Sequence, residues 1–179
     1  MIDGLQEKKF LLCAPDPLMV AAWREKFSGD PRFEIHQSTI LRPDADVWSS
    51  ASDSLLGMAG GLDRAIADTL PGVYEKAQQT LRELYQGFMP VGQAVVIPTG
   101  KDIPKWLVLV PTMPYPAPLS SSEPITLAML ALLRVVFRHP ALTRISVPAY
   151  GTGVGRIRPL EAAAAMRKAV IIYDHEVLS

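Results

Sequence analysis

Apolar and polar residues recur along this chain in two periods, one of two residues and one near 3.6. The period of two, together with short runs of β-branched and apolar residues, predicts strands. The predicted strands span residues 10–14, 33–37, 46–50, 93–98, 105–110 and 144–147. Four prolines in residues 111–118 predict an extended loop that is neither helix nor central strand.

The longer period predicts helices in the segments between these strands. They span residues 17–27, 62–70, 73–85, 124–137 and 160–173. Pro17 and Pro124 stand at first-turn positions, where the missing N–H of proline costs nothing. Strands and helices alternate along most of the chain, which predicts an α/β fold of three layers around a central sheet.

The length of the chain and its charge balance narrow the range of possible functions. With no linker or repeat, residues 1–179 are predicted to form a single domain. Eighteen basic and eighteen acidic residues leave no net charge. Non-specific binding to nucleic acid needs surplus Lys and Arg, so the balance argues against a general nucleic-acid partner.

The sequence also carries expectations about compartment and metal. Cys13 is the only cysteine, so no intrachain disulfide can form and a reducing compartment is favoured. No signal region or membrane-spanning segment is recognisable, which predicts a cytoplasmic protein with no membrane partner. The histidines His36, His139 and His175 are isolated, so no metal site and no cofactor is predicted.

Two glycine-containing loops, residues 49–63 and 148–155, are the candidates for chemistry. Each follows a predicted strand and leads into a helix. Such loops present backbone N–H groups at a helix N-terminus, an arrangement that suits phosphate. The spacing of the second loop matches neither a dinucleotide fingerprint nor a Walker loop. A tight turn between strand and helix remains the alternative for each loop considered alone.

Four ordered blocks of sequence resemble the macro domain family, the ADP-ribose-binding module, and its bacterial and phage-like branch above all. The stretch 52–66, with Met58-Ala59-Gly60-Gly61-Leu62-Asp63, is similar to that branch's Ala-Asn-Ser and Met-x-Gly-Gly-Ile-Asp pattern. Residues 90–94 and 110–113 match further blocks, and residues 148–155 match the second phosphate loop. The resemblance extends roughly from residue 33 to 173 and implies a mixed sheet between helices.

The resemblance implies a cleft for ADP-ribose or a related nucleotide, carried on this chain by the following residues. Gly60, Gly61 and Leu62 would face the distal ribose and its phosphate. Thr152, Gly153 and Val154 would wrap the pyrophosphate with their backbone amides. The ligand-binding residues expected in the second loop are Ala149, Tyr150, Gly151, Thr152, Gly153, Val154 and Gly155. For Tyr150, a core position at the strand end is an equal alternative to packing on a ribose or base.

Three departures from the family pattern affect the expected ligand contacts. The asparagine that holds the distal ribose falls at Asp53, which accepts hydrogen bonds but cannot donate while it is ionised. An Asx turn is the alternative role for Asp53. The adenine-recognising aspartate aligns with Thr39, or with Ser38. The chain ends soon after the last helix, so the usual final strand with an adenine-stacking aromatic is expected to be missing.

Asp63 is the candidate catalytic residue, because some relatives hydrolyse ADP-ribosyl adducts with an acid that activates water. An acid in the first helical turn, stabilised by the helix dipole, is the competing interpretation. The leading hypothesis is a binding module for ADP-ribose or a related nucleotide diphosphate. The alternatives are an ADP-ribosyl hydrolase acting on ADP-ribosylated protein, and a degenerate macro fold that serves as a protein-interaction module.

Overall fold

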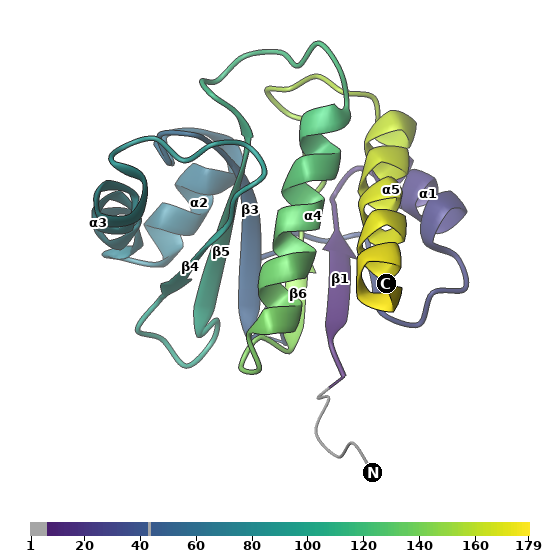
Figure 1. Cartoon of the computed structure of the whole chain (residues 1–179), viewed down its shortest axis with the longest axis horizontal. Coiled ribbons are helices and arrows are strands. Elements are labelled where there is room, and N and C mark those ends of the chain that lie inside the picture. Colours follow the sequence, from purple (N-terminus) through teal and green to yellow (C-terminus); the bar gives the residue numbers. More distant parts are fainter. Residues whose placement is uncertain (1–6, 43) are drawn as a thin grey trace.

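The computed structural model describes residues 7–42 and 44–179, which contain six strands and five helices (Figure 1). The strands are β1 (Lys9–Cys13), β2 (Phe33–His36), β3 (Val47–Asp53), β4 (Val95–Pro98), β5 (Trp106–Met113) and β6 (Arg144–Val147). The helices are α1 (Pro17–Phe27), α2 (Gly61–Thr69), α3 (Val73–Tyr85), α4 (Glu123–Arg138) and α5 (Pro159–Leu178).

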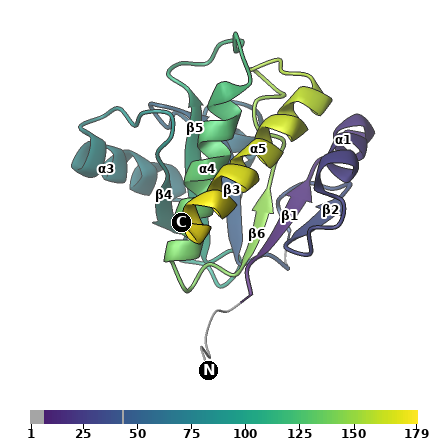
Figure 2. The same ribbon diagram turned by 45° about the vertical axis from the view of Figure 1, so that its right-hand side comes forward.

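The strands form one mixed sheet in the order β2-β1-β6-β3-β5-β4. Every neighbouring pair is parallel except β4 and β5. Helices α1, α4 and α5 cover one face, and α2 and α3 cover the other (Figures 1 and 2). This is the three-layer α/β fold that the sequence predicts. The parallel strands β1, β3, β5 and β6 all end at the same edge of the sheet.

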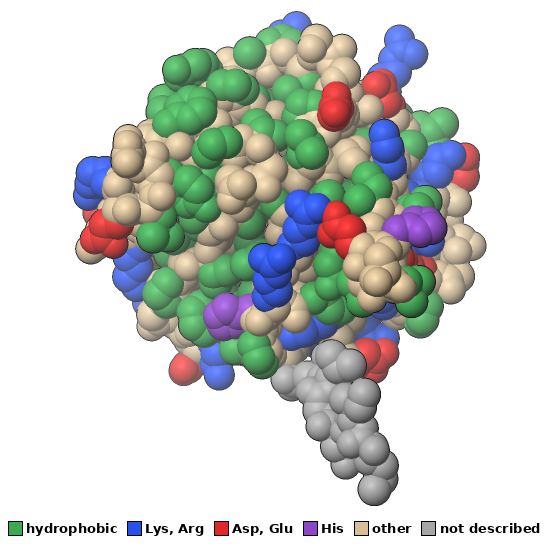
Figure 3. Space-filling model, viewed as in Figure 1, with side chains coloured by type: hydrophobic (Ala, Val, Ile, Leu, Met, Phe, Trp, Pro, Cys, Tyr) green, Lys and Arg blue, Asp and Glu red, His purple; other side chains and the backbone are tan. Residues whose placement is uncertain are grey.

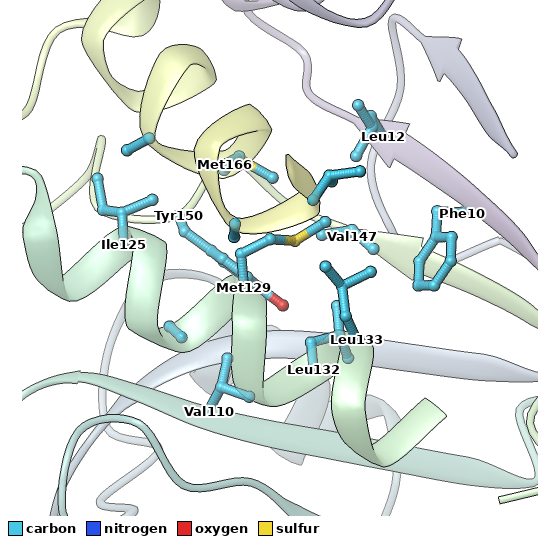
Figure 4. Packing of buried hydrophobic residues seen from close by; sticks show 14 of the residues in the cluster. Phe10, Leu12, Val110, Ile125, Met129, Leu132, Leu133, Val147, Tyr150 and Met166 are labelled. Atoms are coloured by element: carbon cyan, nitrogen blue, oxygen red, sulfur yellow. The ribbon is translucent and has the colours of Figure 1, made fainter. Parts of the chain in front are cut away.

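The central strands are apolar on both faces because helices cover both. Phe10 and Leu12 of β1 pack into the cluster beneath α1, α4 and α5 (Figure 4). Leu11 and Cys13 of the same strand pack into the cluster beneath α2 and α3. Strands buried in this way appear in the sequence as continuous apolar runs, as parallel sheets generally do. The two clusters hold the sheet rigidly and so fix where its loops emerge.

The surface carries charge of both signs. On the face formed by α4 and α5, Lys and Arg side chains lie among acidic and apolar ones (Figure 3). None of the helices in the described ranges is both long enough and apolar enough to cross a bilayer.

Several predicted boundaries are confirmed to the residue. Helices α1 and α3 and strand β6 begin and end where the sequence pattern places them. Helix α5 extends to Leu178, beyond the predicted end at Tyr173. Strand β3 is longer than predicted and includes the polar segment up to Asp53. Its buried serine hydroxyls are accommodated because each has a hydrogen-bond partner, as the site shows below.

The prediction that residues 111–118 contain no central strand is wrong at its start. Strand β5 continues through Pro111 to Met113, and Pro111 pairs with Ser52 of β3. Strand β4 pairs with β5 only as far as Leu109, so the end of β5 has a strand on one side only. A missing N–H is tolerated at such an edge position, which explains why proline fits there.

A buried carboxylate ties the segment before β2 to the last helix. Asp30 accepts hydrogen bonds from the Arg32 guanidinium at 2.7 and 3.0 Å and from Arg167 of α5 at 2.8 Å. Arg32 also pairs with Asp174 of α5 at 2.7 Å. Burial works to raise the pKa of Asp30, but the bonds from Arg32 and Arg167 outweigh it and hold the pKa well below its usual value.

The depressed pKa predicts an acid-sensitive contribution to stability. Asp30→Asn should lower the free energy of unfolding by about 1–3 kcal/mol at neutral pH, because Arg32 and Arg167 each lose the charge of the Asp30 carboxylate, and Arg32 keeps only Asp174. The stabilisation is fully present above the unfolded-state pKa and is lost as the pH falls towards the folded-state pKa. The gap between the two proteins should therefore shrink below about pH 4. Urea unfolding at neutral and acid pH measures it.

The matched control is Asp68→Asn, which removes an exposed i,i+4 pair with Arg64. It should change the free energy of unfolding by less than about 0.5 kcal/mol. A gap for Asp30→Asn that stays constant from neutral pH to pH 3 would contradict the role assigned to this carboxylate.

Candidate functional site

A cavity of about 530 Å³ lies at the edge where the parallel strands end. Its wall includes Cys13 at the end of β1, Asp53 at the end of β3, Met113 at the end of β5 and Pro148 after β6. In open α/β sheets, ligands bind beyond the carboxyl ends of the strands, and this cavity has that location. The loops that follow β5 and β6 lie at the top edge of the molecule in Figure 1.

The first loop joins β3 to α2 and has an unusual backbone. Leu56 and Met58 adopt positive φ angles of 50° and 46°, a region that non-glycine residues rarely occupy. Such strained residues concentrate at functional sites. Gly60 is the N-cap of α2 and provides no side-chain cap. Within the described ranges, the amides of residues 57–63 have no hydrogen-bond acceptor, so the loop and helix end present free N–H groups.

The second loop joins β6 to α5 and requires glycine at two positions. Gly151 has a φ of 75°, and a Cβ on it would lie 2.5 Å from Ile125 Cδ1. A Cβ on Gly155 would lie 2.6 Å from the carbonyl oxygen of Gly151. The loop is folded on itself by bonds from Ile157 N to Gly151 O and from Arg156 N to Gly153 O, both 3.0 Å. The amides of residues 153–155 find no acceptor in the part of the chain that the structure describes.

The structure brings all but one of the predicted site residues to this cavity. Those that line it are Thr39, Asp53, Gly60, Gly61, Leu62, Asp63, Ala149, Gly151, Thr152, Gly153, Val154 and Gly155.

Tyr150 is the exception: it occupies the core position that the sequence offered as an alternative, and its predicted contact with a ligand is wrong. Its side chain is fully buried in the core near Ile125 and Met129 (Figure 4). Its hydroxyl lies 2.8 Å from Ser49 Oγ, and burial raises its pKa well above the usual value. The ring therefore packs beneath the loop and supports it. Ala149 lines the cavity, whereas the next side chain, that of Tyr150, packs into the core.

Asp63 is held in place by two serines of β3. Ser50 Oγ donates to Asp63 Oδ1 at 2.5 Å, and Ser52 Oγ donates to Oδ2 at 2.6 Å. Asp63 is 9% exposed. Burial raises its pKa, the two serine bonds oppose that rise, and the charge of Asp53 adds to it. A carboxylate with a raised pKa in a cavity is a candidate for proton transfer.

Asp53 forms the Asx turn that the sequence offered as one of its roles. Its Oδ1 accepts a bond from Leu55 N at 2.8 Å. Its Oδ2 has no hydrogen-bond partner in residues 7–42 and 44–179. Because Asp53 also lines the cavity, the turn leaves one carboxylate oxygen available for further contacts.

The cavity wall also contains residues for which the sequence predicted no individual role at the site. Asp16 and Pro116 lie outside the candidate segments, whereas Ser50 and Ser52 lie in the first candidate loop, and Thr112 and Met113 in the block 110–113. Asp16 is the N-cap of α1 and accepts a bond from Leu18 N at 2.9 Å, so its sequence signal is that of a helix start. Thr112 and Met113 end β5, and their position became recognisable only with the strand order. No group of three potential metal ligands occurs among residues 7–42 and 44–179.

The comparisons with known proteins agree with this architecture. A family model described as Macro domain matches residues 50–166. An uncharacterised protein of Aquifex aeolicus is 30% identical over 145 residues, which cover 81% of this chain and 84% of that protein. This chain spans only 33–35% of the length of three longer mycobacterial relatives.

Two solved structures share the fold. The Oceanobacillus iheyensis macrodomain with ADP is 23% identical, with a TM-score of 0.63, over 76% of this chain and 73% of that one. Thermosipho africanus DarTG in complex with ADP-ribose is 15% identical, with a TM-score of 0.64, over 75% of this chain and 37% of that one.

Proposed function

The chain belongs to the Macro domain family, and from that premise we propose that its cleft binds ADP-ribose or a related nucleotide diphosphate. The observation that carries the proposal is the pair of amide-rich loops, residues 58–63 and 151–155, on the wall of one cavity. Free N–H groups at loops and helix ends bind phosphate without a lysine.

The electrostatics of the cavity support this mode of binding. Helix α2 begins at Gly61, where the partial positive charge of the helix end adds to the free amides. The two loops follow different strands, and each contributes neutral N–H donors. Together they can therefore contact both phosphates of a diphosphate. The relatives with ADP and with ADP-ribose named above share this fold and add weight to the choice of ligand.

The strand order suggests how the ligand lies. Thr39 follows β2 and Asp53 ends β3, both residues line the cavity, and strands β1 and β6 lie between β2 and β3 in the sheet. In our proposal the adenine lies towards Thr39, the pyrophosphate lies between the two loops, and the terminal ribose lies towards Asp53. A threonine hydroxyl is less selective for the adenine amino group than a carboxylate, so related nucleotides are accepted as well.

A second proposed function is hydrolysis of an ADP-ribosyl bond, favoured by the buried carboxylate of Asp63. In its ionised form Asp63 accepts a proton from a water that attacks the anomeric carbon of the terminal ribose. The bond from that carbon to the protein side chain breaks, and the proton passes to the leaving group. Ser50 and Ser52 hold the carboxylate at one position, as a general base requires.

Calorimetric titration with ADP-ribose tests the binding function, and a charge inserted in the second loop tests the site. A Cβ on Gly153 meets no atom within 4 Å, so side chains fit there. Gly153→Glu should weaken ADP-ribose binding at least about tenfold more than Gly153→Gln, because only glutamate repels the phosphates. Absence of binding at millimolar ADP-ribose, or equal losses in the two variants, would contradict the proposal.

The hydrolase function is tested with a mono-ADP-ribosylated protein and the Asp63→Asn variant. Asparagine keeps the shape of the side chain but cannot act as a base. Loss of label should slow by about a hundredfold or more, while ADP-ribose affinity should change less than about threefold. An equal rate in both proteins would exclude Asp63 from catalysis and leave the binding function standing.

A further inference from the structure

The charge distribution of the cavity indicates which chemical group the bound nucleotide carries. Asp16, Asp53 and Asp63 line the cavity, whereas no Lys, Arg or His from the described ranges does so. A diphosphate bound by neutral amides brings further negative charge into this space. A positive group on the ligand, close to a carboxylate, would offset that repulsion.

Asp53 lines the first cavity and is the strand partner of a residue that borders a second cavity. It pairs with Met113 across the β3–β5 ladder, and Ser54 N donates to Met113 O at 2.9 Å. Thr112 and Met113 line both the first cavity and a neighbouring one of about 400 Å³. A group that extends from the first cavity towards the second must therefore pass close to Asp53, whose Oδ2 is without a partner in the described part of the chain.

The second cavity has the composition of a site for a flat cation. Six of the thirteen residues of its wall are proline, alanine or leucine, and its one charged residue among those described, Glu123, is acidic. Tyr115 lines it with 60% of its surface exposed, and the Phe88 ring lies 6.3 Å from the Tyr115 ring. The face of a tyrosine ring attracts a planar cation.

We propose that the preferred ligand is an ADP-ribose whose terminal ribose carries a planar, positively charged, nitrogen-linked group, such as a pyridinium or a guanidinium. The inference rests on the proposed function, in which the terminal ribose lies towards Asp53. The cationic group then lies beside the Asp53 carboxylate and extends over Met113 towards Tyr115. The cavity thus selects the nucleotide by the charge of its substituent, in addition to its phosphates.

NAD⁺ and NADH are the probes, because they differ in the charge and aromaticity of the ring and are otherwise closely matched. Titration calorimetry of the wild-type protein should give an affinity for NAD⁺ about tenfold or more above that for NADH. The ratio should fall as salt is raised, since Asp53 is partly exposed and its charge is screened. ADP-ribose is titrated in parallel as the reference ligand.

Two variants and a control variant test which residues produce the preference for NAD⁺ over NADH. Asp53→Asn should bring the NAD⁺ to NADH ratio to within about threefold of one, because the charge is removed and the shape is kept. Tyr115→Ala should weaken NAD⁺ by about tenfold and ADP-ribose by much less. The control is Asp16→Asn, which removes a charge from the β1 side of the same cavity and keeps a good N-cap. It should leave the ratio unchanged.

The possible results distinguish a failure of this inference from a failure of the proposed function. If ADP-ribose binds and NAD⁺ binds no more tightly than NADH, the inference is overturned and the proposed function stands. If none of the three nucleotides binds, the proposed function itself fails. A ratio that survives in Asp53→Asn, or that Asp16→Asn lowers equally, would also overturn the inference, because the selectivity would then not arise at Asp53.

Discussion

The structure depends on the parallel pairing of β3 and β6 at the centre of the sheet. Val47 pairs with Ile145 and Trp48 with Ser146, although these residues are about a hundred positions apart in the sequence. Parallel pairing sends both strands towards the same edge. The loops that follow them, residues 54–60 and 148–158, therefore emerge on the same side and line one cavity. If either strand were reversed, the two sets of free amides would lie at opposite ends of the sheet.

The cavity combines neutral donors with acidic side chains, and this combination shapes the proposed chemistry. Backbone amides and a helix end contribute positive potential of the kind that lysine supplies at many phosphate sites. The carboxylates are therefore free for other roles. Asp63 is fixed by Ser50 and Ser52, whereas Asp53 keeps one oxygen without a partner among the described residues. We assign the first to proton transfer and the second to the recognition of a positive group.

Local pattern explains which parts of the fold could be predicted from the sequence. The apolar spacing and Pro17 give α1 its boundaries, and the glycine loops stand out because few other roles need so many glycines. The pairing of strands that are distant in the sequence produces no signal in the local sequence pattern. The order that brings the end of β1, with Asp16, beside the end of β6 could not be deduced, and neither could the one-sided exposure that lets Pro111 join β5.

The direction in which side chains point is the second feature of the site that could not be predicted from the sequence. Sequence similarity marks the segment from Ala149 to Gly155 as a unit, but it does not say which members face a ligand. The structure turns Tyr150 into the core, where its hydroxyl contacts Ser49. The serines of β3 are similar: in sequence they suggest a polar loop, and in the structure they position Asp63. Their role depends on the packing of α2, which carries Asp63, against β3. That contact is visible only in the folded structure.

Amide hydrogen exchange measured by NMR, with and without saturating ADP-ribose, tests the central claim most directly. The account predicts that amides in residues 57–63 and in residues 153–155 both exchange at least about tenfold more slowly in the bound state, since both loops donate to the phosphates. Protection confined to one loop, or located elsewhere on the molecule, would contradict it.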